Sequence, residues 1–193
     1  MSHRVQKQKP QRTCKRTYAN YTSFKPYLRS DFNERCGYCD DRDVYSGGTR
    51  GYQIDHFKPH SIAKFSHLKE EYSNLIYSCP FCNRAKWDKW QESHGFIDPC
   101  SDEYEQHLQR DDRGKILYIT SPQGEYIWKN LKLYLKRHEL LWMIDRLQEQ
   151  SDELDRYLSI LGEGHELELE ILREFRRIQQ EIQRYTNLFY SEI

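Results

Sequence analysis

Hydrophobic residues follow a helical period in the last third of the chain. From 131 to about 161 they recur at Leu140, Ile144, Leu147, Leu154, Leu158 and Leu161. From His165 onward they recur at Ile171, Phe175, Ile178, Ile182, Tyr185 and Phe189. Both are narrow stripes typical of coiled-coil helices. Because Gly162-Glu163-Gly164 separates them, we expect a turn there and an antiparallel two-helix hairpin over 131–193. Its stripes either pack on each other and on the rest of the chain, or bind a partner protein or a second copy.

The pattern before residue 131 is shorter and more varied. Alternation and turn residues predict strands at 52–57, 74–78 and 116–119. Helices are expected at 24–34, where Pro26 lies near the start, and from Asn83 to Trp90. The remainder of 95–128 looks irregular, so the sequence indicates small elements that a thin core must hold together.

Composition narrows the class of protein. Hydrophobic residues make up 37% of the 193, and 15 of them are Tyr. Because so few apolar residues form only a small core, we expect an additional cross-link to stabilise the fold. No run approaches the roughly 18–20 apolar residues that span a bilayer, and residues 1–30 carry no apolar stretch of the signal-peptide kind. We therefore expect a cytoplasmic protein without membrane insertion.

The zero net charge hides an asymmetry. Residues 1–30 carry eight Lys or Arg and no Asp or Glu, whereas the remaining segments are acidic. A flexible basic arm over 1–23 is the prediction. Such an arm adds affinity for nucleic acid or is a solubilising tail, and both interpretations remain open.

Four of the six cysteines form two Cys-x-x-Cys pairs, and 39 residues lie between the pairs. Without a secretion signal, thiols are expected to stay reduced. The pairs then predict a structural zinc site with four thiolates, with disulfides as the alternative. Its ligands are Cys36, Cys39, Cys79 and Cys82. Cys14 and Cys100 fit neither pattern.

Three residues near these pairs suggest a reaction. Asp55 and the side-chain oxygen of Asn83 are hard ligands that suit Mg²⁺ or Mn²⁺. His56 has the side chain best suited to act as a general base near neutral pH. Together they predict metal-assisted hydrolysis of a phosphodiester. Each residue alone is a weak signal, and their order relative to the cysteine pairs is what gives the set its weight.

The ordered set resembles the HNH endonuclease superfamily, in its HNN variant. The resemblance covers roughly residues 30–100. It lies in Asp55-His56 on the first strand, Asn74 opening the second, Asn83 at the helix start, and the Cys-Asn-x-x-Lys ending at Lys86. It implies a ββα-metal (His-Me finger) fold, His56 and Asn74 as catalytic residues, and products with 5′-phosphate and 3′-hydroxyl ends.

Further short motifs resemble those of bacterial HNH nucleases of anti-phage defence, of the Septu or Zorya type. They are Cys-x-Tyr-Cys, His-Phe-x-Pro-x-Ser beginning at His56, and the segment 95–99. This resemblance implies DNA as the substrate, with the chain acting as the effector nuclease, and an ATPase or another defence subunit as a partner of the C-terminal helices. A homodimer is the other arrangement considered. Arg84 and Lys86 are predicted to contact phosphate, or else to form a solvated helix face.

The sequence thus predicts an α+β protein: a zinc-stapled ββα-metal nuclease module with a C-terminal helical hairpin. Its expected parts are a basic arm (1–23), the nuclease module (24–100), an irregular connecting segment (101–130) and the hairpin (131–193). Two alternatives remain. One is a non-catalytic zinc module that binds nucleic acid or protein, and the other is an RNA nuclease with the same chemistry. The sequence does not decide which bases are recognised, or whether one strand or both strands are cut.

Overall fold

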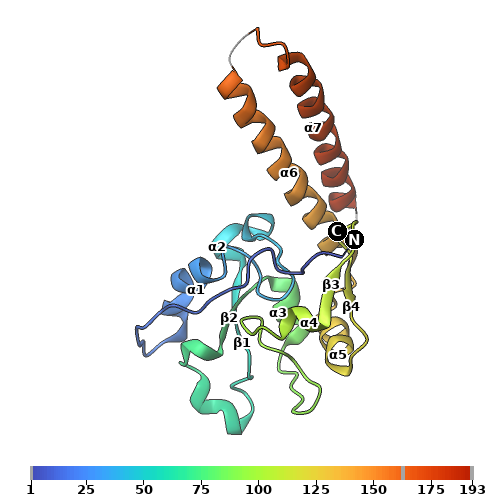
Figure 1. The fold of residues 1–193 in the computed structure, drawn as a ribbon. Coiled ribbons are helices and arrows are strands. Elements are labelled where there is room, and N and C mark those ends of the chain that lie inside the picture. Colours follow the sequence, from blue (N-terminus) through green and yellow to red (C-terminus); the bar gives the residue numbers. More distant parts are fainter. Residues whose placement is uncertain (1, 162–163, 192–193) are drawn as a thin grey trace. The chain divides into compact units, whose positions relative to one another are not determined.

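The computed structural model describes residues 2–161 and 164–191, and the chain divides after Leu135 into two compact units (Figure 1). The α-helices are α1 Lys25–Asp31, α2 Gly48–Gly51, α3 Pro80–Lys86, α4 Tyr104–His107, α5 Pro122–Asn130, α6 Lys136–Leu161 and α7 Glu168–Ser191. The strands are β1 Gln53–His56, β2 Leu75–Ser78, β3 Leu108–Arg110 and β4 Ile116–Tyr118. Short 3-10 turns lie at Tyr21–Phe24, Asp43–Ser46, Ala63–Leu68 and Tyr72–Asn74.

A two-stranded antiparallel sheet and the helix after it form the centre of the first unit (Figure 1). In β1 and β2, Asp55 pairs with Ile76 and His56 with Leu75. All four residues of β2 are buried, whereas only the last two of β1 are. The order strand, strand, helix is the ββα arrangement that the sequence predicts, and both strands were expected.

Helix α3 differs from the expected span of 83–90. It begins at Pro80, because the Sγ of Cys79 accepts the N–H of Cys82 as an N-cap and proline is favoured in the first turn. It ends at Lys86, because Trp87 takes φ 51° and ψ −126°, which no helix can contain. The helix is therefore seven residues long and starts within the second cysteine pair.

The N-terminal segment corrects the expectation of a flexible arm. Val5 is buried, and the N–H groups of Val5 and Gln6 both donate to the carboxylate of Glu105 at 2.9 Å. The Gln6 side chain donates to the carbonyl of Gly37 at 2.8 Å, and Arg12 forms a two-bond ion pair with Asp98. Residues 2–16 therefore belong to the packed unit, because a buried apolar residue and several specific hydrogen bonds fix them.

Residues 101–130 are likewise part of the first unit rather than a connecting segment. They form α4, the β3–β4 hairpin and α5, and of the two strands only the one at 116–119 was expected by position. The buried Arg110 donates to the carbonyls of Cys39 and Gly114 at 2.5 and 2.6 Å. The hydroxyl of Tyr104 donates to the carbonyl of Tyr38 at 2.7 Å. These bonds tie the segment to the first cysteine pair.

The second unit is the helical hairpin that the sequence predicts, with α6 and α7 packed side by side (Figure 1). The Nε2 of Gln179 donates to the Oγ of Ser151 at 2.6 Å across the pair. The first helix begins at Lys136 instead of 131, because Lys132 has a φ of 54° that ends α5 in a turn. Of the predicted turn, Gly162 and Glu163 lie outside the described residues, and Gly164 has the positive φ of a glycine turn. Within the described part of the chain, none of the helices combines the length and apolar character needed to cross a membrane.

Candidate active site and metal centre

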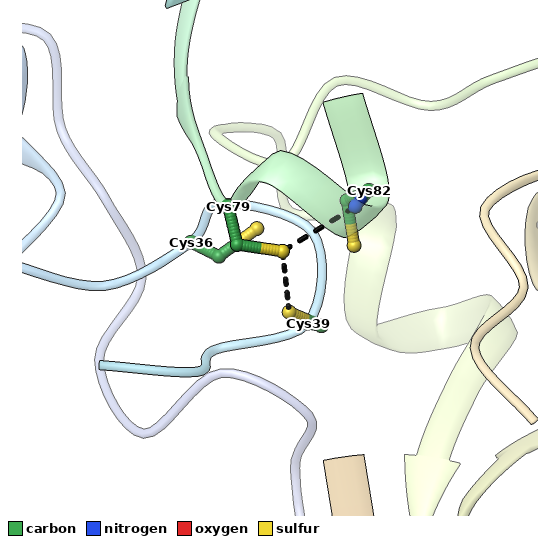
Figure 2. A group of neighbouring side chains, drawn as sticks. All are labelled: Cys36, Cys39, Cys79 and Cys82. Atoms are coloured by element: carbon green, nitrogen blue, oxygen red, sulfur yellow. Dashed lines mark hydrogen bonds between the residues drawn. The ribbon is translucent and has the colours of Figure 1, made fainter. Parts of the chain in front are cut away.

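The two cysteine pairs converge on one point (Figure 2). Their sulfur atoms all lie within 4.8 Å of one another, and all four side chains are buried. The first pair lies in the loop before β1, and the second lies at the start of α3. Gly37 N–H donates to the Tyr77 carbonyl at 2.9 Å, which fixes the first pair beside β2. The four thiols are therefore arranged to hold a metal ion.

The distance between two of these sulfurs indicates which ion fits. Cys39 Sγ lies 3.7 Å from Cys79 Sγ (Figure 2). A tetrahedral site with Zn–S bonds of about 2.3 Å has sulfurs about 3.8 Å apart. None of the six cysteines is in a disulfide, so the alternative of two disulfides is not what the structure shows. The residues present thus fit zinc.

His56 is the last residue of β1, and a contact of its Nε2 atom fixes the ring. This nitrogen lies 2.9 Å from the carbonyl oxygen of Lys69. Because a carbonyl can only accept, we assign the imidazole proton to Nε2, which leaves the lone pair of Nδ1 free. Tyr21 and His60 pack against the ring at centroid distances of 4.8 and 4.2 Å. Burial lowers the pKa of His56 below its ordinary value, so the neutral form that can accept a proton prevails at neutral pH.

Asn74 holds the long loop between the two strands. Its Oδ1 accepts the N–H of Lys58 at 2.8 Å, and its Nδ2 donates to the carbonyls of Lys58 and Leu68 at 3.0 and 3.3 Å. Its own carbonyl accepts the N–H of Phe57 at 2.8 Å. The same loop carries Lys69, whose carbonyl fixes His56, so Asn74 acts on His56 through the loop.

A buried network surrounds Asp55. Its two oxygens lie 3.0 and 3.1 Å from the Nζ of Lys86, and one also accepts the hydroxyl of Tyr38 at 2.5 Å. Lys86 further donates to the carbonyl of His56 at 2.7 Å. Burial raises the pKa of Asp55 and lowers that of Lys86, and the attraction between the two opposes both shifts. The network therefore joins β1 to α3 next to His56.

These contacts correct one predicted role and relocate another. Lys86 was expected to contact phosphate, yet its side chain is 0% exposed, so it cannot reach a substrate. Arg84 lines a different cavity, together with Phe81 and Lys132, and not the one at His56. A phosphate contact by Arg84 stays a prediction for a part of the substrate away from the reacting bond.

Asp55, His56 and Asn83 do line one cavity, of about 340 Å³. Asn83 Nδ2 donates to the side-chain oxygen of Gln53 at 2.5 Å, so its own oxygen remains available to an ion. Asp55, whose oxygens also contact Lys86, contributes to the lining of the same cavity. A carboxylate and an amide oxygen in one polar cavity fit a Mg²⁺ or Mn²⁺ ion.

Sequence reasoning missed other residues of this cavity. They are Tyr21, Ile54, Pro59, His60, Ser61, Trp87 and Asp88. Trp87 and Asp88 lie here because α3 ends at Lys86 and the chain turns back. Neither glycine nor proline marks that end in the sequence, so only the backbone conformation reveals it. Tyr21 comes from the segment expected to be a flexible arm.

Comparison with known proteins agrees with this geometry. Residues 36–89 match the family model described as HNH endonuclease. The chain is also 28% identical to the Septu protein PtuB of Bacillus mycoides (strain KBAB4), over 61% of this chain and 48% of that protein. It thus spans about half the length of this relative. The matched residues contain both cysteine pairs, both strands of the central sheet and α3. The segment 36–89 is therefore an HNH endonuclease domain.

Proposed function

We propose that the chain is a metal-dependent endonuclease that hydrolyses phosphodiester bonds of DNA, acting as the effector nuclease of a bacterial anti-phage system of the Septu type. The observation that carries the proposal is the position of His56. Its Nε2 is occupied by the Lys69 carbonyl, its Nδ1 is free, and it shares a cavity with Asp55 and Asn83. A module that only bound zinc would need the four cysteines and none of these residues.

In the proposed reaction, Nδ1 of His56 takes a proton from a water molecule. The resulting hydroxide attacks the phosphorus, a new P–O bond forms, and the bond from phosphorus to the 3′ oxygen breaks. The 3′ oxygen gains a proton from solvent, which leaves 5′-phosphate and 3′-hydroxyl ends. Asn74 holds the loop at Lys58 and Leu68, next to Lys69, and the Lys69 carbonyl keeps the His56 ring oriented.

Asp55 and Asn83 would hold the catalytic ion, Mg²⁺ or Mn²⁺. When bound, the ion stabilises negative charge on the phosphate and on the departing oxygen. Lys86 and Tyr38 orient the Asp55 carboxylate from behind. The four cysteines would hold a zinc ion that fixes the loop before β1 to the start of α3.

Cleavage of nucleic acids by the purified chain tests this proposal. Supercoiled plasmid and an RNA transcript of the same sequence are each incubated with Mg²⁺, with Mn²⁺ or with EDTA. We expect nicked or linear plasmid with either metal and intact plasmid with EDTA. Cleavage of the transcript alone would replace DNA with RNA as the substrate. Plasmid that stays supercoiled with both metals would contradict the proposal.

We also propose that the hairpin of α6 and α7 binds the ATPase subunit of such a system. Large apolar side chains remain exposed on it, with Ile160 and Leu169 79% and 59% exposed. Co-expression with the ATPase followed by affinity purification should recover both chains. The Ile160→Glu and Leu169→Glu variants should lose the ATPase. Unchanged recovery with both variants, or a homodimer as the only complex, would contradict this assignment.

A further inference from the structure

The cavity at His56 has an unusual lining for a site that binds nucleic acid. None of its ten lining residues is Lys or Arg, and two of them, Asp55 and Asp88, are acidic. Four carry flat rings, contributed by Tyr21, His56, His60 and Trp87. This lining therefore offers a substrate several aromatic faces and no Lys or Arg side chain.

Trp87 is a ring that can offer such a face. It is 72% exposed, whereas His56 is buried, and the half-buried Tyr21 and the exposed His60 both pack against the His56 ring. A side chain so exposed contributes little to the core. Packing in this unit therefore gives no reason for a large apolar ring at this position.

The backbone conformation at position 87 is unfavourable for a tryptophan. Lys89 N–H donates to the Lys86 carbonyl at 3.0 Å, and Trp87 has φ 51° and ψ −126°. These are the features of a type II′ turn with Trp87 at its first central position, where glycine is strongly preferred. A tryptophan here costs folding free energy, and such strain tends to be found at functional sites.

We propose that Trp87 is a stacking platform for a nucleobase beside the scissile phosphate. The inference rests on the proposed nuclease function and adds a contact for the substrate. The phosphate would lie toward Asp55 and Asn83, and the neighbouring base would lie on the indole face. Every base has such a face, so the contact favours nucleic acid with an unpaired base without selecting a sequence.

The test compares two oligomers of the same length and charge, oligodeoxythymidylate and an abasic chain. Binding is measured by fluorescence anisotropy in EDTA with the full chain carrying His56→Ala, which together are expected to suppress cleavage. We expect the added Trp87→Gly to weaken binding of oligodeoxythymidylate roughly 5- to 150-fold and to leave abasic binding unchanged. Trp87→Phe should keep most of the affinity. Tyr190→Ala, which removes a ring that is 71% exposed on α7, should have no effect.

Thermal melting of the same variants separates stacking from a structural role. Glycine suits the type II′ turn, so Trp87→Gly should melt at or above the temperature of its parent. Equal oligodeoxythymidylate affinity in variant and parent, or a lower melting temperature in Trp87→Gly, would overturn the inference. If the chain with His56 intact still cleaves plasmid in that case, only the stacking role fails. If the chain with His56 intact leaves plasmid supercoiled as well, the proposed function fails with it.

Discussion

Replacing Lys86 with Met tests the buried network behind the active site. Methionine keeps most of the volume and removes the ammonium group. The structure then leaves both oxygens of Asp55 without their cation at 3.0 and 3.1 Å, and the His56 carbonyl without its donor at 2.7 Å. Among the described residues, the Tyr38 hydroxyl is the remaining hydrogen-bond donor to the carboxylate.

The expected size of the effect follows from burial. Lys86 and Asp55 are 0% and 5% exposed, so water replaces the lost partner poorly. Removal of one member of a buried ion pair typically costs about 3–5 kcal/mol. For a unit of this size, that corresponds to a fall in melting temperature of roughly 10–20 °C. We expect DNA cleavage to fall as well, because Lys86 fixes the backbone of His56.

The assay is thermal unfolding of Lys86→Met, of Asp55→Asn and of the double variant. The double variant removes both charges, so it should be more stable than Lys86→Met alone. Lys64→Met is the matched control, since Lys64 is 55% exposed and its pairing with Glu92 at the surface contributes little to stability. A Lys86→Met protein that melts with the wild type, or a double variant no more stable than Lys86→Met, would refute the reasoning.

Three further variants test other parts of the account. Cys82→Ser should lose the bound metal and unfold the module, because structural zinc in small domains contributes about 10–16 kcal/mol. Metal content and circular dichroism measure this, and a metal-free protein with normal folding would refute the structural role of the zinc site. Gly37→Ala places a Cβ 2.7 Å from the Phe32 ring and 2.9 Å from Ile76. It should therefore lower the free energy of unfolding, measured by urea titration, by about 1–3 kcal/mol. Unchanged stability would show that the loop around Gly37 can shift to make room. Asn74→Ala should lower the free energy of unfolding by about 1–3 kcal/mol, because the loop that contains Lys69 loses hydrogen bonds. The cleavage rate should fall while the metal content stays normal. An unchanged rate would show that Asn74 does not contribute to catalysis.

Local sequence patterns predicted the elements whose side chains carry the signal. The alternation around Asp55 and the apolar run at β2 gave both strands, and the cysteine pairs gave the four residues that now meet at one point. The helical stripes gave the hairpin. These features depend on neighbours in sequence, so a pattern can reveal them.

Features that depend on distant contacts escaped prediction. Val5 and Gln6 look like part of a polar arm until Glu105 is placed beside their N–H groups. Lys86 on a short helix looks exposed until the helix is docked on β1, where Asp55 receives it. The end of α3 depends on the conformation of Trp87, at which the sequence offers no glycine. Each outcome is decided by tertiary packing that overrides local propensity.

Plasmid cleavage by His56→Ala, with zinc content measured on the same samples, tests the central claim most directly. His67→Ala is the matched control, because His67 lies in the loop that follows β1, is exposed and does not line the cavity. General-base catalysis contributes roughly 10²–10⁴-fold, so His56→Ala should cleave slower by about that factor with Mg²⁺ or Mn²⁺. His67→Ala and wild type should cleave alike, and all three should hold about one zinc ion per chain. Cleavage by His56→Ala at the wild-type rate would contradict the account.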